Sequence, residues 1–290
     1  MEDSFTKIIQ TAWLTAYPRI FSDIPLSAEI FQELEQSKKA QGDDEVPEEF
    51  KVPKLAPELE ARYKLVNRLL AENNSHQIFE IASGLSPRGF IMSQNPSIEY
   101  VELDLAQMID EKRKIMEALI AQSKLTPASN LRLLAGNALD PNDLTRATAH
   151  FKKDQPIAVI NEGLLRYLSF PEKTIVAKNI YTLLKTYGGV WITPDITLRK
   201  LLETQNEITM PGKNKRIAEL TSKNIDQNRF ENEGQARAFF EKMGFSVERH
   251  GLNEVTSELF SPNRLNIASD EVESMIGPAV VFVMKVRPSA

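Results

Sequence analysis

The 290-residue chain contains no cysteine. This absence excludes disulfide bonds, thiolate metal sites and a cysteine nucleophile, and it suits a reducing compartment. Long apolar runs are also missing, because no stretch reaches the ~18 residues that a membrane helix needs. The N-terminal residues, MEDSFTKIIQ, lack the charged and then apolar pattern of a signal peptide. The sequence therefore predicts a soluble cytoplasmic protein without a membrane partner.

Positive charge and histidine are scarce as well. The formal net charge is −5, which disfavours a nucleic-acid partner. The 3 histidines are His76, His150 and His250, and the first two precede predicted strands, on the side away from a ligand site. His250 ends a predicted strand, where a structural role is the simpler interpretation. The sequence thus offers no obvious general base and no metal site, and it does not indicate an oligomeric state.

Predicted strands and helices alternate along the chain, which is typical of a parallel sheet. The last strand is expected to lie antiparallel beside the sixth, at the sheet edge. The predicted fold class is α/β, with a seven-stranded, mostly parallel Rossmann-like sheet and an N-terminal helical cap. The strands are expected at 77–82, 98–103, 131–135, 157–161, 190–194, 245–250 and 279–286, and the helices at 5–21, 25–36, 57–73, 106–122, 171–186 and 233–243.

The domain organisation is predicted as a single domain over residues 1–290. Within it we expect a helical cap at 1–75, a cofactor-binding core at 76–195, a lid insertion at 196–232 and the C-terminal part of the sheet at 233–290. The stretch 251–277 is expected as a loop with helical character, and it is long for a loop in a compact domain. A binding loop and plain surface decoration both remain open for it and for the lid insertion.

The turn after the first strand suits a nucleoside ligand. It contains one glycine, Gly84, and Ala82 stands where a dinucleotide motif would have another glycine, which argues against a pyrophosphate cofactor. Ser86 is placed to cap a helix that starts at Pro87. Asp104 ends the second strand about 20 residues later, the usual spacing for a ribose ligand. A tight turn with no ligand is the alternative.

Polar residues or a glycine follow each of the first four predicted strands. Because the carboxyl ends of parallel strands meet at one edge, these residues are expected to line one crevice. Asp104 is the better ribose ligand by position, and Glu102, two residues earlier, is the second choice. Asn137 is placed to contact an adenine. Glu162, within INEGLLRYLSFPEK, would be costly to bury without a partner.

Five motifs carry a family resemblance: TAWLTAYPRIF, EARYKLVNRLL, FEIASGLSPRGF, YVELDLAQMIDEK and PIAVINEGLLRYLS. In this order, over about residues 11–195, they resemble the leucine carboxyl methyltransferase family, which includes bacterial O-methyltransferases of the polyketide-tailoring type. The chain differs from the family pattern at Ala82, where a glycine is usual, and at Ser86, where an aspartate is usual. The resemblance implies a class I S-adenosylmethionine fold, with S-adenosylhomocysteine as product.

The same resemblance implies roles for individual residues. It assigns Arg62 to the cofactor carboxylate, Ala82 and Gly84 to the turn, Asp104 to the ribose, Asn137 and Ala138 to the adenine, and Glu162 and Gly163 to the cofactor pocket. Tyr167 and Arg166 are candidate acceptor contacts. Without the resemblance, Arg62 is a surface arginine paired with Glu58 one helical turn away.

The predicted function is an S-adenosylmethionine-dependent O-methyltransferase of EC class 2.1.1. Its acceptor would be a carboxylate or hydroxyl of a polyketide-like small molecule, or a protein C-terminus. A carboxylate, with a pKa near 4, needs no general base, so the lack of an obvious base favours it. One alternative is a non-catalytic cofactor-binding or protein-interaction module. A nicotinamide-dependent oxidoreductase is disfavoured by the missing glycines and the antiparallel last strand.

Overall fold

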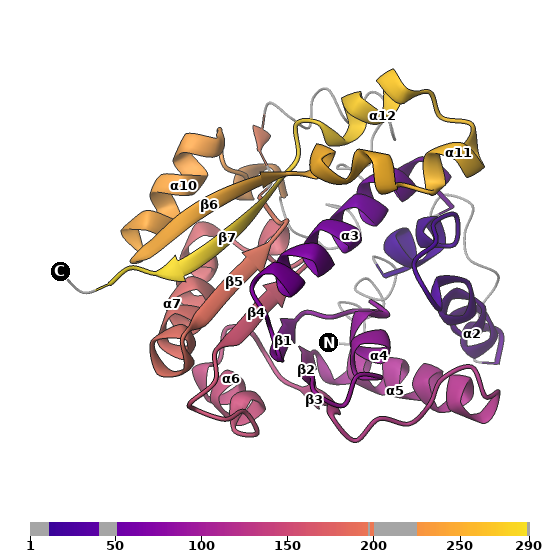
Figure 1. Cartoon of the computed structure of the whole chain (residues 1–290), viewed down its shortest axis with the longest axis horizontal. Coiled ribbons are helices and arrows are strands. Elements are labelled where there is room, and N and C mark those ends of the chain that lie inside the picture. The colour runs from indigo at the N-terminus through magenta and orange to yellow at the C-terminus, as the bar shows by residue number, and fades with distance from the viewer. Residues whose placement is uncertain (1–11, 41–50, 197, 200–224, 289–290) are drawn as a thin grey trace.

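Seven strands form one sheet in the order β3-β2-β1-β4-β5-β7-β6. The computed structural model describes residues 12–40, 51–196, 198–199 and 225–288 (Figure 1). The strands are β1 (Gln77–Ile81), β2 (Glu99–Asp104), β3 (Leu131–Ala135), β4 (Ile157–Asn161), β5 (Gly189–Thr193), β6 (Phe245–Gly251) and β7 (Val280–Val286). β1 to β5 pair in parallel, and β7 lies antiparallel between β5 and β6. The predicted, mostly parallel sheet with an antiparallel last strand is confirmed. Its edge strands are β3 and β6, so β7 lies one strand inside the edge at which it was expected.

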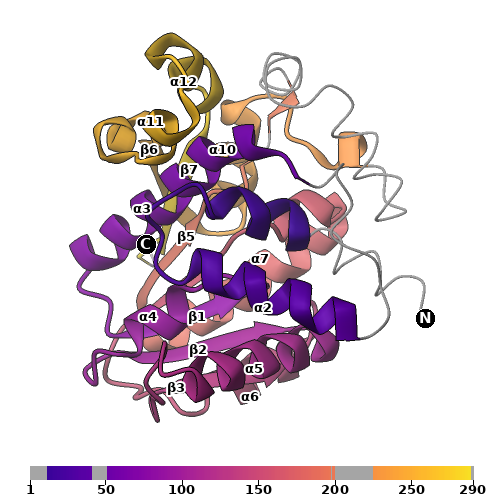
Figure 2. The ribbon, with the colours of Figure 1, turned by 90° about the vertical axis from the view of Figure 1, so that its right-hand side faces the viewer.

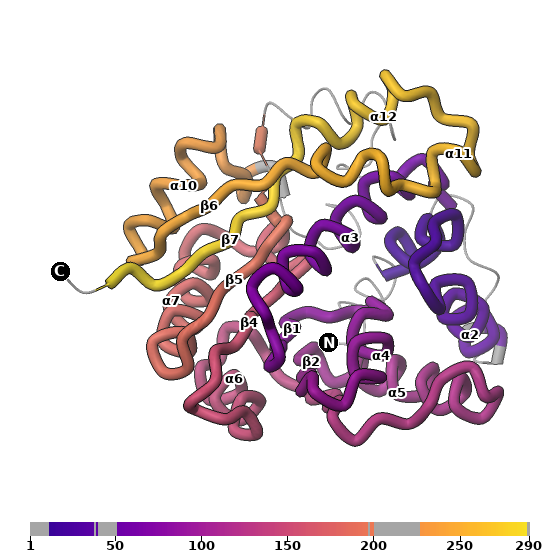
Figure 3. The backbone as a smooth tube through the Cα atoms, in the orientation of Figure 1, coloured from indigo at the N-terminus to yellow at the C-terminus, as the bar shows by residue number. Residues whose placement is uncertain are grey.

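The central strands are buried on both faces. Every residue of β1 and β4 is buried. β4 is apolar up to Asn161, as burial on both faces favours, whereas β1 also buries the polar side chains of Gln77 and Glu80. Alternate side chains still point to opposite faces: Phe79 and Trp191 belong to one hydrophobic cluster, and Ile78 and Ile160 to another. The backbone trace shows the chain passing from β1 through α4 to β2, while β4 lies on the other side of β1 (Figure 3). This reversal is the switch point at which such sheets bind ligands.

Helices cover both faces of the sheet. The helices α6 (Pro141–Thr148), α7 (Phe170–Tyr187) and α10 (Glu233–Lys242) pack over one face. The other face is covered by α3 (Ala56–Glu72), η5 (Leu252–Glu258) and α12 (Ser269–Ile276), with α11 (Ser261–Leu265) beside α3. A third cluster joins the helical residues 12–19, α2 (Ser27–Ala40), α4 (Arg88–Met92) and α5 (Ala106–Ala121), and Figure 2 shows α2 alongside α5. Short 3-10 turns are η2 (Pro53–Leu55), η3 (Leu165–Tyr167) and η4 (Ile225–Asn228).

Local signals explain where α7 begins and ends. The Ser169 hydroxyl accepts a hydrogen bond from the Glu172 backbone N–H, and the Glu172 carboxylate accepts one from the Ser169 backbone N–H. The helix ends before Gly188, whose φ of 73° only glycine adopts readily.

Two sequence predictions change in the structure, and one helix was not predicted. The helix after β1 starts at Arg88 rather than Pro87, because Pro87 is its cap residue and the Ser86 hydroxyl accepts from the Arg88 backbone N–H at 3.3 Å. The stretch 251–277 has the expected helical character but is ordered as η5, α11 and α12, which pack on α3, rather than as a long loop. The short helix α6 was not predicted. The proposed lid at 196–232 lies mostly outside the described residues, as does the start of the helix expected at 5–21.

Within the described ranges, no helix combines the length and apolar character needed to cross a membrane. The same residues contain no group of three or more side chains that could hold a metal ion.

Glu102 and Lys112 form a buried ion pair between β2 and α5. Both side chains are at most 1% exposed, and the Lys112 ammonium lies 5.3 Å from the centre of the Phe90 ring. Gly89 is essential above this pair, because a Cβ there would lie 2.0 Å from a Glu102 carboxylate oxygen. Burial raises the pKa of Glu102 to about 7 despite the nearby ammonium. Lys112 is the group that most favours the ionised form of Glu102, against the effect of burial.

We expect Lys112→Met to lower the free energy of unfolding by about 3–5 kcal/mol, because it leaves Glu102 buried without a counter-charge. The double variant Glu102→Gln, Lys112→Met should regain most of that loss, since it removes both charges. Denaturant titration measures both values. A double variant as unstable as the single one would show that packing, rather than the uncompensated charge, causes the loss.

Candidate functional site

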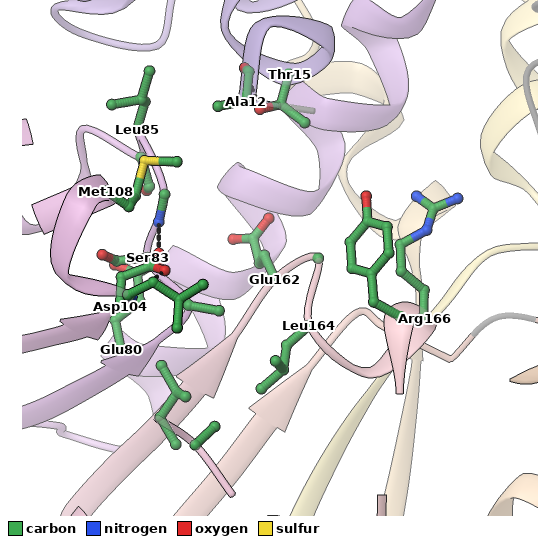
Figure 4. Close-up of a pocket in the computed structure, with 18 of the residues that line it drawn as sticks. Ala12, Thr15, Glu80, Ser83, Leu85, Asp104, Met108, Glu162, Leu164 and Arg166 are labelled. Carbon is green, nitrogen blue, oxygen red and sulfur yellow. Dashed lines mark hydrogen bonds between the residues drawn. The ribbon is translucent and has the colours of Figure 1, made fainter. Parts of the chain in front are cut away.

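A cavity of about 480 Å³ opens at the carboxyl ends of β1, β2 and β4 (Figure 4). Its wall consists of the turn after β1, the end of β2, residues 136–139 after β3 and the loop after β4. The helical residues 12–19 and α3 contribute the opposite side. The strand-end crevice expected from the sequence is therefore present at the switch point between β1 and β4. No residue of 251–277 lines it.

The predicted site residues, with one exception, line this cavity. They are Arg62, Ala82, Gly84, Asp104, Asn137, Ala138, Glu162, Gly163, Arg166 and Tyr167. The exception is Glu102, and its expected position at the site is wrong. It shares a strand face with Asp104 but lies two residues deeper, where α4 covers it and Lys112 pairs with it. The candidate ribose ligand is therefore Asp104.

The turn after β1 is held by the carboxylate of Asp104. One oxygen accepts a hydrogen bond from the Gly84 N–H at 2.7 Å and the other accepts one from the Leu105 N–H at 2.7 Å. Burial raises the pKa of Asp104, although these two bonds work against the rise. Ala82 has a φ of 56°, a left-handed conformation that costs a non-glycine residue about 1 kcal/mol. A Cβ at Gly84 would meet nothing within 4 Å, so the turn leaves room for a ligand.

The loop after β4 is held by Asp195, which follows β5 and is 3% exposed. Its carboxylate accepts hydrogen bonds from the backbone N–H groups of Gly163 at 2.7 Å, Leu164 at 2.6 Å and Leu165 at 3.0 Å. It also accepts one from the Asn161 side-chain amide at 2.9 Å. Sequence reasoning missed this residue, although an acid directly after a strand end was a usable signal. Asp195 shapes the loop without lining the cavity.

We expect Asp195→Asn to weaken S-adenosylmethionine binding about tenfold, because a neutral amide replaces a carboxylate that accepts several N–H groups. Calorimetric titration measures the affinity. Asp154→Asn, at an exposed position, is the matched control and should bind as the unmodified protein does. Unchanged affinity in Asp195→Asn would mean that the loop keeps its conformation without this charge.

The Arg88 guanidinium fixes Glu162. Arg88 is fully buried and pairs with Glu80 at 2.7 Å and with Glu162, while its Nε donates to Asn67 at 2.8 Å. Tyr63 stacks against the guanidinium at 4.9 Å from its ring centre. Burial opposes the charge of Glu162, but Arg88 and the arginines nearby outweigh it, so its pKa lies below the ordinary value. Glu162 therefore remains ionised, and sequence reasoning missed the partner that keeps it so.

Arg62 both pairs with Glu58 and lies at the cavity, so the structure agrees with both interpretations that the sequence left open. It pairs with Glu58 of the same helix at 2.6 Å, and it also lines the cavity. Arg166 and Tyr167 lie in η3, with the guanidinium 5.8 Å from the Tyr167 ring centre, and Figure 4 shows Arg166 beyond Glu162 in the loop after β4. Their contact with an acceptor remains a prediction.

A family model described as leucine carboxyl methyltransferase matches residues 18–181, more than half of the chain. The chain belongs to the leucine carboxyl methyltransferase family. The protein is accordingly an S-adenosylmethionine-dependent methyltransferase, and the predicted cofactor is confirmed. Comparison with the curated proteins finds no match.

Solved structures support the fold of this methyltransferase. A DUF574 family protein from Streptomyces avermitilis has a TM-score of 0.56 at 15% identity, with 96% of this chain and 97% of that chain covered. The methyltransferase domain of bacterial CtHen1-C has a TM-score of 0.50 at 13% identity, with 79% and 98% covered. At such identities the likeness concerns the fold alone, which is that of a class I methyltransferase.

Proposed function

We propose that this methyltransferase transfers the methyl group to an oxygen of a small molecule, and that this oxygen belongs to a carboxylate. The observation that carries the proposal is the state of the acidic groups in the cavity wall. Methyl transfer to a hydroxyl needs a group that removes its proton, whereas a carboxylate is already ionised at neutral pH.

The carboxylates of the cavity wall are all engaged. Glu80 accepts from Arg88 and from the Tyr100 hydroxyl at 2.6 Å, and Glu162 pairs with Arg88. Glu58 pairs with Arg62, and Asp104 accepts two backbone N–H groups. Among the described residues, no histidine lines the cavity. A wall with several arginines and no free base favours an acceptor that arrives as an anion.

The cavity residues fit S-adenosylmethionine. In this proposal Asp104 accepts the ribose hydroxyls, Asn137 and Ala138 contact the adenine, and Arg62 binds the amino-acid carboxylate. Ala82, Gly84, Glu162 and Gly163 would surround the methionine part, and the open space where a Cβ would project from either glycine supports this placement. When bound, the cofactor supplies a methyl group on a positively charged sulfur.

The residues of the protein would position the acceptor and the cofactor and would exclude water from the site. An in-line methyl transfer depends mainly on holding the reacting atoms in line and dry. Arg166 and Tyr167 would contact the acceptor, and Leu55, Leu59 and Leu168 give the wall an apolar part that suits a largely apolar acceptor.

The decisive assay measures S-adenosylhomocysteine formation with a panel of aromatic and aliphatic carboxylic acids and a matched panel of phenols and alcohols. We expect methyl esters from the acids. Ether products alone would contradict the carboxylate proposal while retaining O-methylation. Cofactor binding without product from either panel would favour the non-catalytic alternative.

Asp104→Asn should weaken S-adenosylmethionine and adenosine alike by at least about tenfold, because a charge-assisted bond to the ribose is lost in both. Calorimetric titration with the two ligands measures this. Asp154→Asn again serves as the control. A variant with unchanged affinity for both would show that Asp104 holds only the turn.

A further inference from the structure

Arg19 is a buried cation in the wall of the cavity. It is the last residue of the helical segment 12–19 and is 8% exposed. Ala12 and Thr15 lie on the same helical face and also line the cavity, where Figure 4 shows them opposite Glu162. The Arg19 Nε is buried without a hydrogen-bond partner, and no described residue forms an ion pair with the terminal nitrogens.

The other two arginines around Glu162 have acceptors. Arg88 is bonded to Glu80, Glu162 and Asn67, and Arg62 is bonded to Glu58. Arg19 is attracted by the carboxylates of Glu162 and Glu80. Both of these carboxylates already pair with Arg88. Arg19 feels their charge without making a direct contact.

Such an arrangement is unfavourable in the free protein. An arginine stays protonated at every ordinary pH, so it cannot escape burial by losing its charge. Burial lowers the pKa of Arg19, and the attraction of Glu162 offsets this only in part. The end of a helix favours a cation, but the guanidinium makes no bond to the helix carbonyls. The Arg19 guanidinium therefore lines the open cavity with a buried Nε that has no acceptor and with no ion-pair partner among the described residues.

We propose that Arg19 binds a carboxylate of the ligand, as a second carboxylate-binding residue beside Arg62. A planar, two-oxygen anion matches the guanidinium fork. The carboxylate has two possible sources, the amino-acid part of S-adenosylmethionine or the acceptor. The second source rests on the proposed function, whereas the first does not.

The test compares S-adenosylhomocysteine with 5′-methylthioadenosine, which lacks the amino-acid carboxylate, in calorimetric titrations of the unmodified protein and Arg19→Gln. If the cofactor supplies the carboxylate, Arg19→Gln weakens S-adenosylhomocysteine at least about tenfold and leaves methylthioadenosine within about twofold. Arg62→Gln in the same series shows whether the two arginines share one carboxylate. Arg132→Gln, a remote arginine paired with Glu99, is the control and should change neither affinity.

If the acceptor supplies the carboxylate, both nucleoside affinities stay unchanged. Benzoate, titrated into protein saturated with S-adenosylhomocysteine, then binds the unmodified protein and not Arg19→Gln. The proposal is overturned if no affinity changes, or if S-adenosylhomocysteine and methylthioadenosine weaken equally, because Arg19 would then only shape the cavity. The acceptor panel tests the reaction separately, so failure of one proposal does not mimic failure of the other.

A stability measurement separates binding from folding. Because Arg19 is a buried charge that pairs directly with no residue in the described part of the chain, Arg19→Gln should melt at the same temperature as the ligand-free unmodified protein or a few degrees above it. Arg19→Lys keeps the charge but not the fork, and its loss of carboxylate binding should be intermediate. A marked drop in melting temperature for both variants would identify Arg19 as a structural residue and overturn the proposal.

Discussion

The buried guanidinium of Arg88 connects the two strands between which the ligand cavity opens. It pairs with Glu80 of β1 and with Glu162 just beyond β4, and Asn67 and Tyr63 of α3 complete its surroundings. Breaking a buried pair of this kind costs about 3–5 kcal/mol. If the loop after β4 moved away from β1, the buried charge of Arg88 would lose its Glu162 partner. The cavity wall is therefore defined before any ligand binds.

Two aspartate carboxylates hold the turns on either side of this connection. Asp104 accepts backbone N–H groups of the turn after β1, and Asp195 accepts those of the turn after β4. A carboxylate that bonds several N–H groups orders a turn more firmly than neutral acceptors do. Both turns border the cavity, so its shape depends on polar contacts within the protein rather than on the ligand. This preorganisation suits a reaction that depends mainly on position.

Much of the site could be predicted because strand ends in a parallel sheet share one edge. That rule brought Gly84, Asp104 and Glu162 together from their sequence positions alone. The same rule was misleading for Glu102, because strand periodicity gives the face of a residue and not its depth beneath a helix. Asp195 was missed because its partners lie 30–34 residues away, and a sequence does not show which backbone N–H groups lack acceptors.

The sequence by itself determined the sheet, the family and the strand-end residues of the cavity, because apolar periodicity and local motifs act over short distances along the chain. Only the tertiary structure decided which charges are satisfied. Arg62 has a partner one helical turn away, which the sequence could indicate. Arg19 has no ion-pair partner among the residues that the structure describes, because Glu80 and Glu162 both pair with Arg88. Electrostatic partnership follows distance in space, and segments far apart in the chain set that distance only after folding.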